Sequence, residues 1–381
     1  MLDTLVAPTP RRGRTPRPGR WHRVRRVLAV ALVSFLLLTT VSYVRALTYP
    51  GHATFLSRSA GWVRDNGGDP LVNVLENWYY TRHAPSTNPP PLSSLPPAPA
   101  ATGGTGPVAL PGSARLPGEG RWASGRPNAQ GQPAAYTTFI QPDPAHASVI
   151  AGVAWIRAGA TSAHLVAGTA QPNTGRWPGG GKITPADVPG LVTTFNSGWK
   201  LQDISGGFFV RGQTAGALRP GQASLVVDDT GAITVGAWGR DVAMTPHTVA
   251  VRQNLALIVD RGAPVAGLAT NAAQLWGSAS NQLQFTWRSG VGVDAAGNVI
   301  YVAGDGLTLA TLADALTQAG AVRAMQLDIH PGMAFYASWT PTGPVPSGSG
   351  VAPTKLLPSM PGSAQRYLAP DQRDFLYLTL R

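Results

Sequence analysis

Three polar residues in the last third of the chain could carry chemistry, because each borders a segment that is expected to be a β-strand. Asp328 and His330 directly follow the apolar segment Ala321 to Leu327, and Arg288 stands before another apolar segment. An aspartate at a strand end can act as acid, base or nucleophile, histidine titrates near neutral pH, and arginine can grip two phosphate oxygens. For each residue the alternative is ordinary: a surface arginine, or an aspartate that caps a turn. The residue types favour chemistry on an anionic substrate.

Two glycine-bearing turns could bring a ligand close to the backbone. Asn196-Ser197-Gly198 follows the apolar segment Leu191–Phe195, and Ser205-Gly206-Gly207 stands just before another strand-like segment. Small residues at a strand end allow close approach, and the amide of Asn196 offers both a donor and an acceptor. These turns are candidate substrate-binding elements, although such glycines also mark tight turns or bulges.

A hairpin and a helix are predicted to position the polar residues. The β-branched segments Val291–Asp294 and Val299–Val302 are separated by a loop that can reverse the chain, Ala295-Ala296-Gly297-Asn298. Thr308 can cap a helix over residues 308–319, because its leucines fall on one face. The chain then enters the strand that ends at Asp328.

The rest of the body is expected to be rich in strands and turns, with few helices. We therefore predict an α+β domain, built on a mostly antiparallel sheet and preceded by one transmembrane helix. The further strand candidates are Ala135–Ile140, Ser148–Arg157, His164–Gly168, Leu191–Phe195, Gly207–Arg211, Ala223–Val227, Ile233–Ala237, Val249–Val251, Leu255–Val259 and Gln284–Trp287.

The composition excludes several kinds of site. The 381 residues include 45 Gly and 35 Pro but no cysteine, so disulfides, thiolate metal sites and a cysteine nucleophile are excluded. The 7 histidines are scattered without ligand spacing, so no metal and no cofactor are expected.

The basic charge is concentrated at the N-terminus and predicts membrane topology. Residues 1–26 hold eight arginines against Asp3, which gives +7 of the total +12. The uncharged segment Val27–Val44 is just long enough to span a bilayer, and the arginines before it should stay cytoplasmic. A single-pass plasma-membrane anchor with an extracytoplasmic C-terminal domain is therefore expected, and nucleic-acid binding is disfavoured. A cleaved signal peptide is the competing interpretation.

Two segments separate the anchor from the main domain at residues 121–381. Residues 45–83 are rich in aromatic side chains, and a helix over 70–80 would present a face that packs on the domain or on the membrane surface. Residues 84–120 are rich in Pro, Gly and Ala, which favours an extended spacer or, as the lesser alternative, a polyproline ligand.

Taken in order, the polar motifs resemble the phosphodiester glycosidase domain family. Asn196-Ser197-Gly198-Trp199 resembles the family's Asn-Gly-Gly-Phe-Phe turn, and Arg288-Ser289-Gly290-Val291-Gly292, with Asp294, resembles its Arg-Thr-Ala-Ile-Gly strand. Leu327-Asp328-Ile329-His330 stands in the place of its Leu-Asp-Gly-Gly-Gly-Ser strand end. The likeness covers about residues 151–333. The anchor, with the segments 238–241, 251–255 and 373–375, is similar to the membrane-anchored members found in actinobacteria.

The resemblance implies hydrolysis of sugar-1-phosphodiester linkages in a phosphorylated glycan or cell-wall polymer. It implies that Arg288 holds the phosphodiester charge, that Asp328 acts at the anomeric carbon or the leaving oxygen, and that Asn196 fixes a sugar hydroxyl. Asp294 and Asp241 are candidates for a second carboxylate.

One departure from the family pattern leaves the activity open. The glycines that usually follow the aspartate are replaced by Ile329-His330-Pro331-Gly332. Either the substrate differs and His330 supplies acid–base chemistry, or hydrolysis is lost and the protein binds an anionic polysaccharide of the envelope without cleaving it.

Overall fold

The computed structural model describes residues 20–49, 54–97, 107–110, 115–172, 177–278, 280–343 and 350–381. The chain divides into two compact units, residues 1–48 and 49–381. In the first unit α1 (Arg20–Thr48) is one continuous helix, and its segment Trp21–Thr48 is long and apolar enough to cross a membrane. This helix confirms the expected apolar segment. The predicted tail before Arg20 and residues 98–106 and 111–114 of the predicted linker lie outside the described residues.

The second unit opens with two helices that form a hairpin. Helix α2 (Phe55–Val63) is capped by Thr54, and α3 (Asp69–Arg82) contains the helix expected over 70–80. They are joined by the kinked segment η1 (Arg64–Gly68), in which the backbone leaves helical geometry at Asn66 and Gly67. We call residues 55–82 the helical hairpin.

The main sheet has eight strands, and every pairing between the described strands of the protein is antiparallel. In spatial order its strands are β1 (Ala123–Ser124), β2 (Ala135–Ile140), β3 (Ala151–Ile156), β14 (Val299–Leu307), β13 (Thr286–Val293), β15 (Arg323–Ile329), β11 (Leu257–Asp260) and β12 (Ala263–Pro264). The predicted strands 284–287 and 291–294 are mostly one strand, β13.

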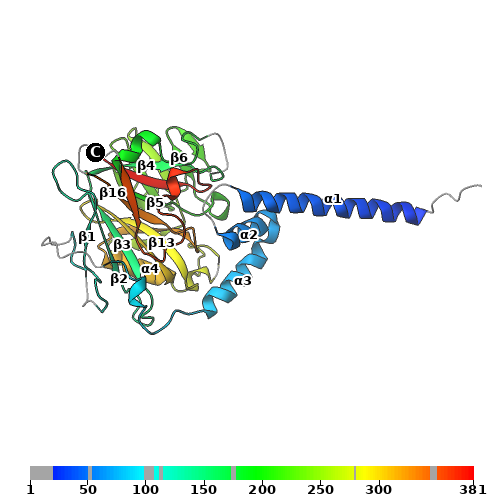
Figure 1. The fold of residues 1–381 in the computed structure, drawn as a ribbon, viewed down its shortest axis with the longest axis horizontal. Helices are drawn as coiled ribbons and strands as arrows, with labels where there is room; N and C mark the ends of the chain where they lie inside the picture. The colour runs from blue at the N-terminus through cyan, green and yellow to red at the C-terminus, as the bar shows by residue number, and fades with distance from the viewer. Residues whose placement is uncertain are drawn as a thin grey trace, which may run out of the picture. The chain divides into compact units, whose positions relative to one another are not determined.

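Two five-stranded sheets complete the body (Figure 1). The second sheet runs in the order β7 (Gln213–Ala215), β6 (Phe208–Val210), β10 (Thr248–Gln253), β8 (Ala223–Asp228) and β9 (Ile233–Ala237). The third sheet runs in the order β17 (Val351–Lys355), β16 (Tyr336–Pro341), β5 (Leu191–Asn196), β18 (Phe375–Leu380) and β4 (Thr161–Val166). The expected fold class, mostly antiparallel sheet with few helices, is confirmed.

Helix α4 (Leu309–Gln318) covers one face of the main sheet. Thr308 and Thr311 cap it reciprocally, and Leu312 and Leu316 are fully buried. A Cβ on Gly290 of β13 would stand 2.8 Å from Leu316, so the glycine lets the helix approach the strand. The remaining described helical turns are short: η2 (Leu92–Ser94), η3 (Pro185–Gly190), η4 (Leu201–Asp203), η5 (Asn281–Leu283) and η6 (Arg366–Leu368).

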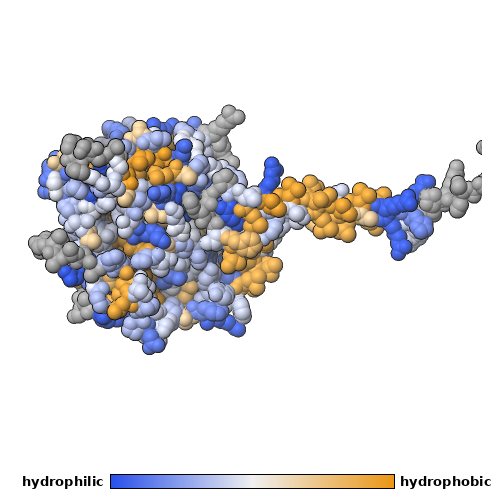
Figure 2. Space-filling model, in the orientation of Figure 1, coloured by the Kyte–Doolittle hydropathy of each residue, from blue (hydrophilic) through white to orange (hydrophobic). Residues whose placement is uncertain are grey.

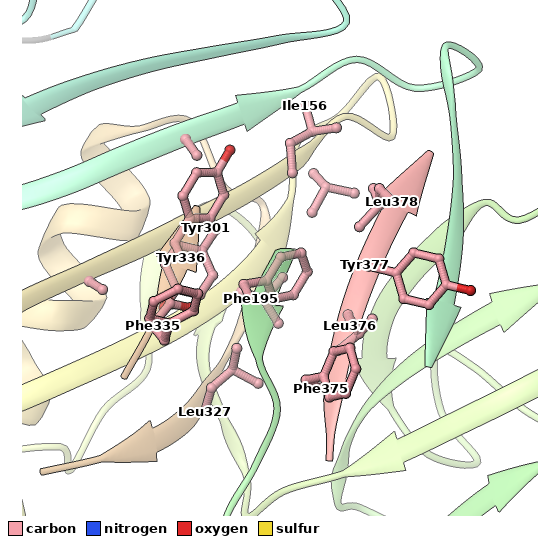
Figure 3. Close-up of a cluster of buried hydrophobic side chains, with 14 of the residues drawn as sticks. Ile156, Phe195, Tyr301, Leu327, Phe335, Tyr336, Phe375, Leu376, Tyr377 and Leu378 are labelled. Atoms are coloured by element: carbon pink, nitrogen blue, oxygen red, sulfur yellow. The ribbon is translucent and has the colours of Figure 1, made fainter. Parts of the chain in front are cut away.

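The largest hydrophobic core lies on the other face of the main sheet and joins all three sheets. Figure 3 shows Phe195 of β5, Tyr301 of β14 and Phe375 of β18 converging there. The rings of Phe195 and Tyr301 have their centroids 5.2 Å apart. β5 ends and β18 begins beside this core. The core therefore fixes the strand ends that carry the polar residues.

The described parts of residues 84–120 lie against the body and do not form a free spacer. Leu95 and Leu116 are buried in the core, and Val108 O accepts a hydrogen bond from the indole of Trp122. The carboxylate of Glu119 accepts hydrogen bonds from three backbone amides. Apolar and polar contacts therefore hold a segment whose composition alone favoured an extended linker.

Candidate functional site

Asp328 stands at a β-bulge, where β15 carries one more residue than its neighbour. Arg288 of β13 pairs with Ile329, but Gly290 pairs with Gln326, so Ser289 alone faces two residues of β15. The Ser289 hydroxyl donates to the carbonyl of Asp328 at 2.8 Å, and the Asp328 amide donates to Ser197 O at 3.0 Å. Bulges re-aim side chains and recur beside active sites.

The Asp328 carboxylate is held by one arginine and one backbone amide. Its Oδ2 lies 2.7 Å from a guanidinium nitrogen of Arg373, and its Oδ1 accepts from the Ile329 amide at 3.0 Å. The residue is only 8% exposed, and this burial raises its pKa, although the nearby Arg373 opposes the shift. A carboxyl group with a raised pKa keeps its proton to higher pH and can donate it.

Arg373 connects Asp328 to the first glycine turn. The same guanidinium nitrogen that meets Asp328 donates to Gly198 O at 2.9 Å, whereas the buried Nε has no hydrogen-bond partner. Sequence reasoning noted Arg373 only as part of a family-like segment. The signal for its role is the pairing of Phe375 with Asn196, which brings the start of β18 to the end of β5.

Asn196 uses its whole side-chain amide inside the protein. Its Nδ2 donates to Ser197 O at 2.9 Å and to the Ser289 hydroxyl at 3.0 Å. Its Oδ1 accepts from the Tyr301 hydroxyl at 2.8 Å and from the Phe335 amide at 2.9 Å. The geometry therefore makes Asn196 a positioning residue behind Asp328, and this differs from the expected contact with a sugar hydroxyl.

A buried ion pair lies directly behind the glycine turn. Arg252 Nε donates to Asp374 Oδ2 at 2.7 Å, and both side chains are 1% exposed. Arg252 also donates to the carbonyl oxygens of Trp199 and Gln253. A Cβ on Gly198 would stand 3.1 Å from the guanidinium carbon, so a larger residue there would press on this arginine.

His330 takes an unusual backbone conformation beneath α3. Its φ of 77° lies in the left-handed region, where glycine is favoured, so the histidine keeps a conformation that glycine could supply. Its ring stacks on Tyr80 with centroids 5.3 Å apart, and its Nε2 lies 3.5 Å from Glu76 Oε2.

Burial works against the acid–base role expected for His330 near neutral pH. Burial, with the positive charges of Arg64 and Arg288, lowers the pKa of His330 to about 3. The imidazole is therefore neutral, and its contact with Glu76 is a polar contact between a neutral ring and a carboxyl group. Burial also raises the pKa of Glu76, which Arg64 partly offsets.

We expect His330 to make the protein less stable in acid. Its folded pKa of about 3 lies below the ordinary value of 6.5, so between these values the unfolded chain binds a proton that the folded chain does not. This contribution is lost as the pH falls from 6.5, by about 1.4 kcal/mol per pH unit. Urea unfolding of wild type and His330→Asn between pH 7 and 4.5 should therefore show a steeper decline for wild type; parallel curves would contradict this.

Arg288 points away from Asp328, into the α4 side of the main sheet. It is fully buried and donates to the carbonyl oxygens of Leu307, Asn281 and Gln284. Its NH1 atom has no hydrogen-bond partner, and burial lowers its pKa to about 9. Ser289, the next residue along β13, faces Asn196 instead, as strand alternation requires.

The structure places the remaining sequence-predicted residues in two separate parts of the fold. Gly206 and Gly207 are buried beside β10, where Gln253 Oε1 accepts from the Gly207 amide at 3.1 Å, while Ser205 is exposed. Asp294 lies beyond the other end of β13, and its oxygens bind the hairpin turn at Ala296 and Asn298.

Asp241 and a metal site are the last two possibilities that the sequence analysis considered. Asp241 pairs with Arg240 at 2.6 Å and lies 3.5 Å from Arg323, which begins β15 at the end opposite Asp328. Among the residues that the structure describes, no three histidine, aspartate or glutamate side chains are grouped to hold a metal ion.

The elements that carry Asn196, Arg288 and Asp328 form one contiguous part of the fold, and a family comparison covers the same part. Residues 192–328 match the model of the phosphodiester glycosidase family. The match begins in β5 and ends at Asp328, so the phosphodiester glycosidase region includes Asn196 and Ser289. Arg373, His330 and the helical hairpin lie outside it.

Three solved structures are similar to this chain at low sequence identity. The catalytic domain of zebrafish N-acetylglucosamine-1-phosphodiester α-N-acetylglucosaminidase, auto-inhibited by its pro-peptide, is 15% identical with a TM-score of 0.42, over 68% of this chain and 87% of that one. A hypothetical protein from Synechocystis is 14% identical with a TM-score of 0.36, over 65% and 62%. A putative exported protein from Burkholderia pseudomallei is 15% identical with a TM-score of 0.33, over 61% and 74%. No curated protein matches the chain.

Proposed function

We propose that the protein is a membrane-anchored, extracytoplasmic hydrolase that cleaves sugar-1-phosphodiester linkages in envelope glycans. The observation that carries the proposal is the Asp328–Arg373 pair, which stands at a strand bulge at the end of the phosphodiester glycosidase region. Helix α1 is the proposed anchor, with the arginine-rich end in the cytoplasm and residues 49–381 outside.

In this proposal Asp328 is the catalytic residue. Hydrolysis breaks the bond between the anomeric carbon and the phosphate oxygen; water gives its hydroxyl group to the carbon, and a proton goes to the phosphate. The raised pKa of Asp328 suits a group that gives a proton to the leaving oxygen. Phosphate is a better leaving group than an alcohol, so we assign no second carboxylate.

Arg373 is the proposed partner of the phosphodiester charge, the role that the family resemblance implies for Arg288. Arg373 lies 2.7 Å from the carboxylate, and its guanidinium is the positive charge nearest to Asp328 that a phosphodiester would meet in this proposal. Arg288 binds the carbonyl oxygens of Leu307, Asn281 and Gln284, and it contributes buried positive charge beneath the strand. Asn196 and Ser289 set the position of the Asp328 backbone.

One observation favours the alternative, binding of an anionic polysaccharide without cleavage. Asp328 and His330 are nearly enclosed, and Tyr80 and Glu76 of α3 lie directly on His330. A binding protein needs positive charge near the surface but not a reachable carboxyl group, and Arg373 could supply that charge.

The two functions are separated by an assay of products. The full chain in detergent is incubated with a panel of sugar-1-phosphodiesters that differ in the sugar. Hydrolysis should release reducing sugar and phosphomonoester in equal amounts, and at least one substrate should be turned over. Binding of these compounds without release of sugar from any of them would favour the polysaccharide-binding function.

A further inference from the structure

The outer face of the helical hairpin is apolar and exposed. On α3 the side chains of Leu71, Val74, Leu75 and Trp78 are 53–65% exposed, and their spacing places them in one stripe. Phe55 and Leu56 extend the apolar surface onto α2, and Figure 2 shows it as a continuous orange area there. Soluble monomers rarely leave large contiguous apolar patches in water, so this face is expected to have a partner.

The opposite face of the hairpin is fixed to the body, so the apolar stripe cannot turn inward. Tyr80 O accepts from the Phe285 amide at 3.2 Å, and Asn77 Oδ1 accepts from the side chain of Gln284. On α2, the Ser57 hydroxyl donates to Pro331 O at 3.1 Å. Asp65, between the helices, lies 3.1 Å from the ammonium of Lys200. The hairpin therefore has one polar face toward the protein and one apolar face toward its surroundings.

The short segment between α1 and α2 indicates that the helical hairpin lies near the lipid. Helix α1 ends at Thr48 and α2 begins at Phe55, so six residues join them and span at most about 20 Å. Because α1 is long and apolar enough to cross a bilayer, the hairpin cannot lie far from the point where α1 leaves the lipid. Its side chains also suit an interface: Trp78 is partly covered by the guanidinium of Arg82, 5.6 Å from the ring centroid, and Tyr79 follows.

We propose that the outer face of the helical hairpin, residues 55–82, is a membrane-interface surface that lies in the lipid headgroup region. Amphipathic helices bind there through their apolar stripe, while aromatic and arginine side chains lie among the headgroups. The inner face of α3 contacts His330, so the candidate site lies about one helix diameter, roughly 10 Å, from the lipid. The binding surface does not depend on the proposed hydrolysis.

The absence of cysteine allows a direct test in the full chain. Leu75→Cys carries an NBD fluorophore on the apolar stripe, and Ala296→Cys carries it on the exposed β13–β14 turn as the matched control. Each labelled chain is reconstituted into vesicles of phosphatidylcholine and phosphatidylglycerol, with or without phosphatidylcholine that bears a shallow doxyl group. We expect at least threefold quenching of the label at position 75 by doxyl lipid, and little at position 296.

A further variant separates lipid contact from simple closeness to the anchor. Adding Trp78→Glu to Leu75→Cys should abolish most of the quenching, because a charge then interrupts the stripe, while α1 still holds the chain in the vesicle. Equal quenching at positions 75 and 296 would overturn the proposal. NBD emission at position 75 could instead be unaffected by doxyl lipid but change with the ratio of protein to lipid. That result would overturn the proposal in favour of contact between two copies of the chain.

Discussion

Replacing Asp328 with asparagine is expected to lower kcat/KM for a sugar-1-phosphodiester by about 10²–10⁴-fold, the range for loss of an acid–base catalyst. Asparagine keeps the size of the side chain and can still accept from the Ile329 amide. It can neither give up a proton nor carry the charge that Arg373 faces. Steady-state kinetics on the purified full chain measure the effect, and circular dichroism verifies that the variant is folded.

Asp294→Asn is the matched control for this substitution. Asp294 directly follows β13, the neighbour of the strand that carries Asp328, but its oxygens bind the turn at the far end of β13, so activity should stay within about twofold of wild type. Asp328→Asn activity within tenfold of wild type, with both variants folded, would remove Asp328 from the chemistry.

Replacing Arg252 with methionine is expected to cost about 3–5 kcal/mol of unfolding free energy, the largest effect on stability that we anticipate. Arg252 and Asp374 are 1% exposed, and the substitution leaves the Asp374 carboxylate buried without its partner. Two carbonyl oxygens behind the Gly198 turn lose a donor as well. Denaturant unfolding of residues 49–381 within the full chain, followed by tryptophan fluorescence, measures the loss.

The same substitution at an exposed arginine provides the control. Arg240 pairs with Asp241 and Asp260, but its side chain is 52% exposed, so Arg240→Met should cost less than about 1 kcal/mol. The double variant Arg252→Met with Asp374→Leu removes both charges and should recover much of the stability. Equal losses at Arg252 and Arg240 would show that the buried pair does not stabilise the fold in this way.

Strands and helices with a clear periodic pattern in their own sequence were predicted well. The strands Ala135–Ile140 and Ile233–Ala237 have the predicted bounds, and α4 lies within the predicted helix 308–319. Among the described strands longer than three residues, three were not predicted: β16, β17 and β18. Two of them, β16 and β17, contain a proline, which weakens the strand signal of a short segment. The segment of β18, Phe375–Leu380, is apolar and aromatic and does favour a strand, but nothing in it shows that it pairs with β4 and β5.

The candidate site was predictable only in part, because strand pairing decides which side chains meet there. The sequence placed Asp328 and Asn196 at the ends of apolar strands, and the structure joins these two strand ends through Ser289. The sequence did not find the role of Arg373, which depends on the pairing of β18 with β5. It chose Arg288, although Ser289 is the residue that faces Asn196, because a β-bulge and strand alternation decide which neighbour points to the site. The left-handed backbone of His330 was also hidden, because histidine rarely takes it.

Hydrolysis in water enriched in ¹⁸O tests the central claim most directly. The full chain is given a sugar-1-phosphodiester that it turns over, and both products are analysed by mass spectrometry. Cleavage at the anomeric carbon predicts that the label appears in the released sugar and that the phosphomonoester carries none. Label in the phosphate would show that the phosphorus–oxygen bond breaks instead, and that would contradict a phosphodiester glycosidase mechanism at Asp328.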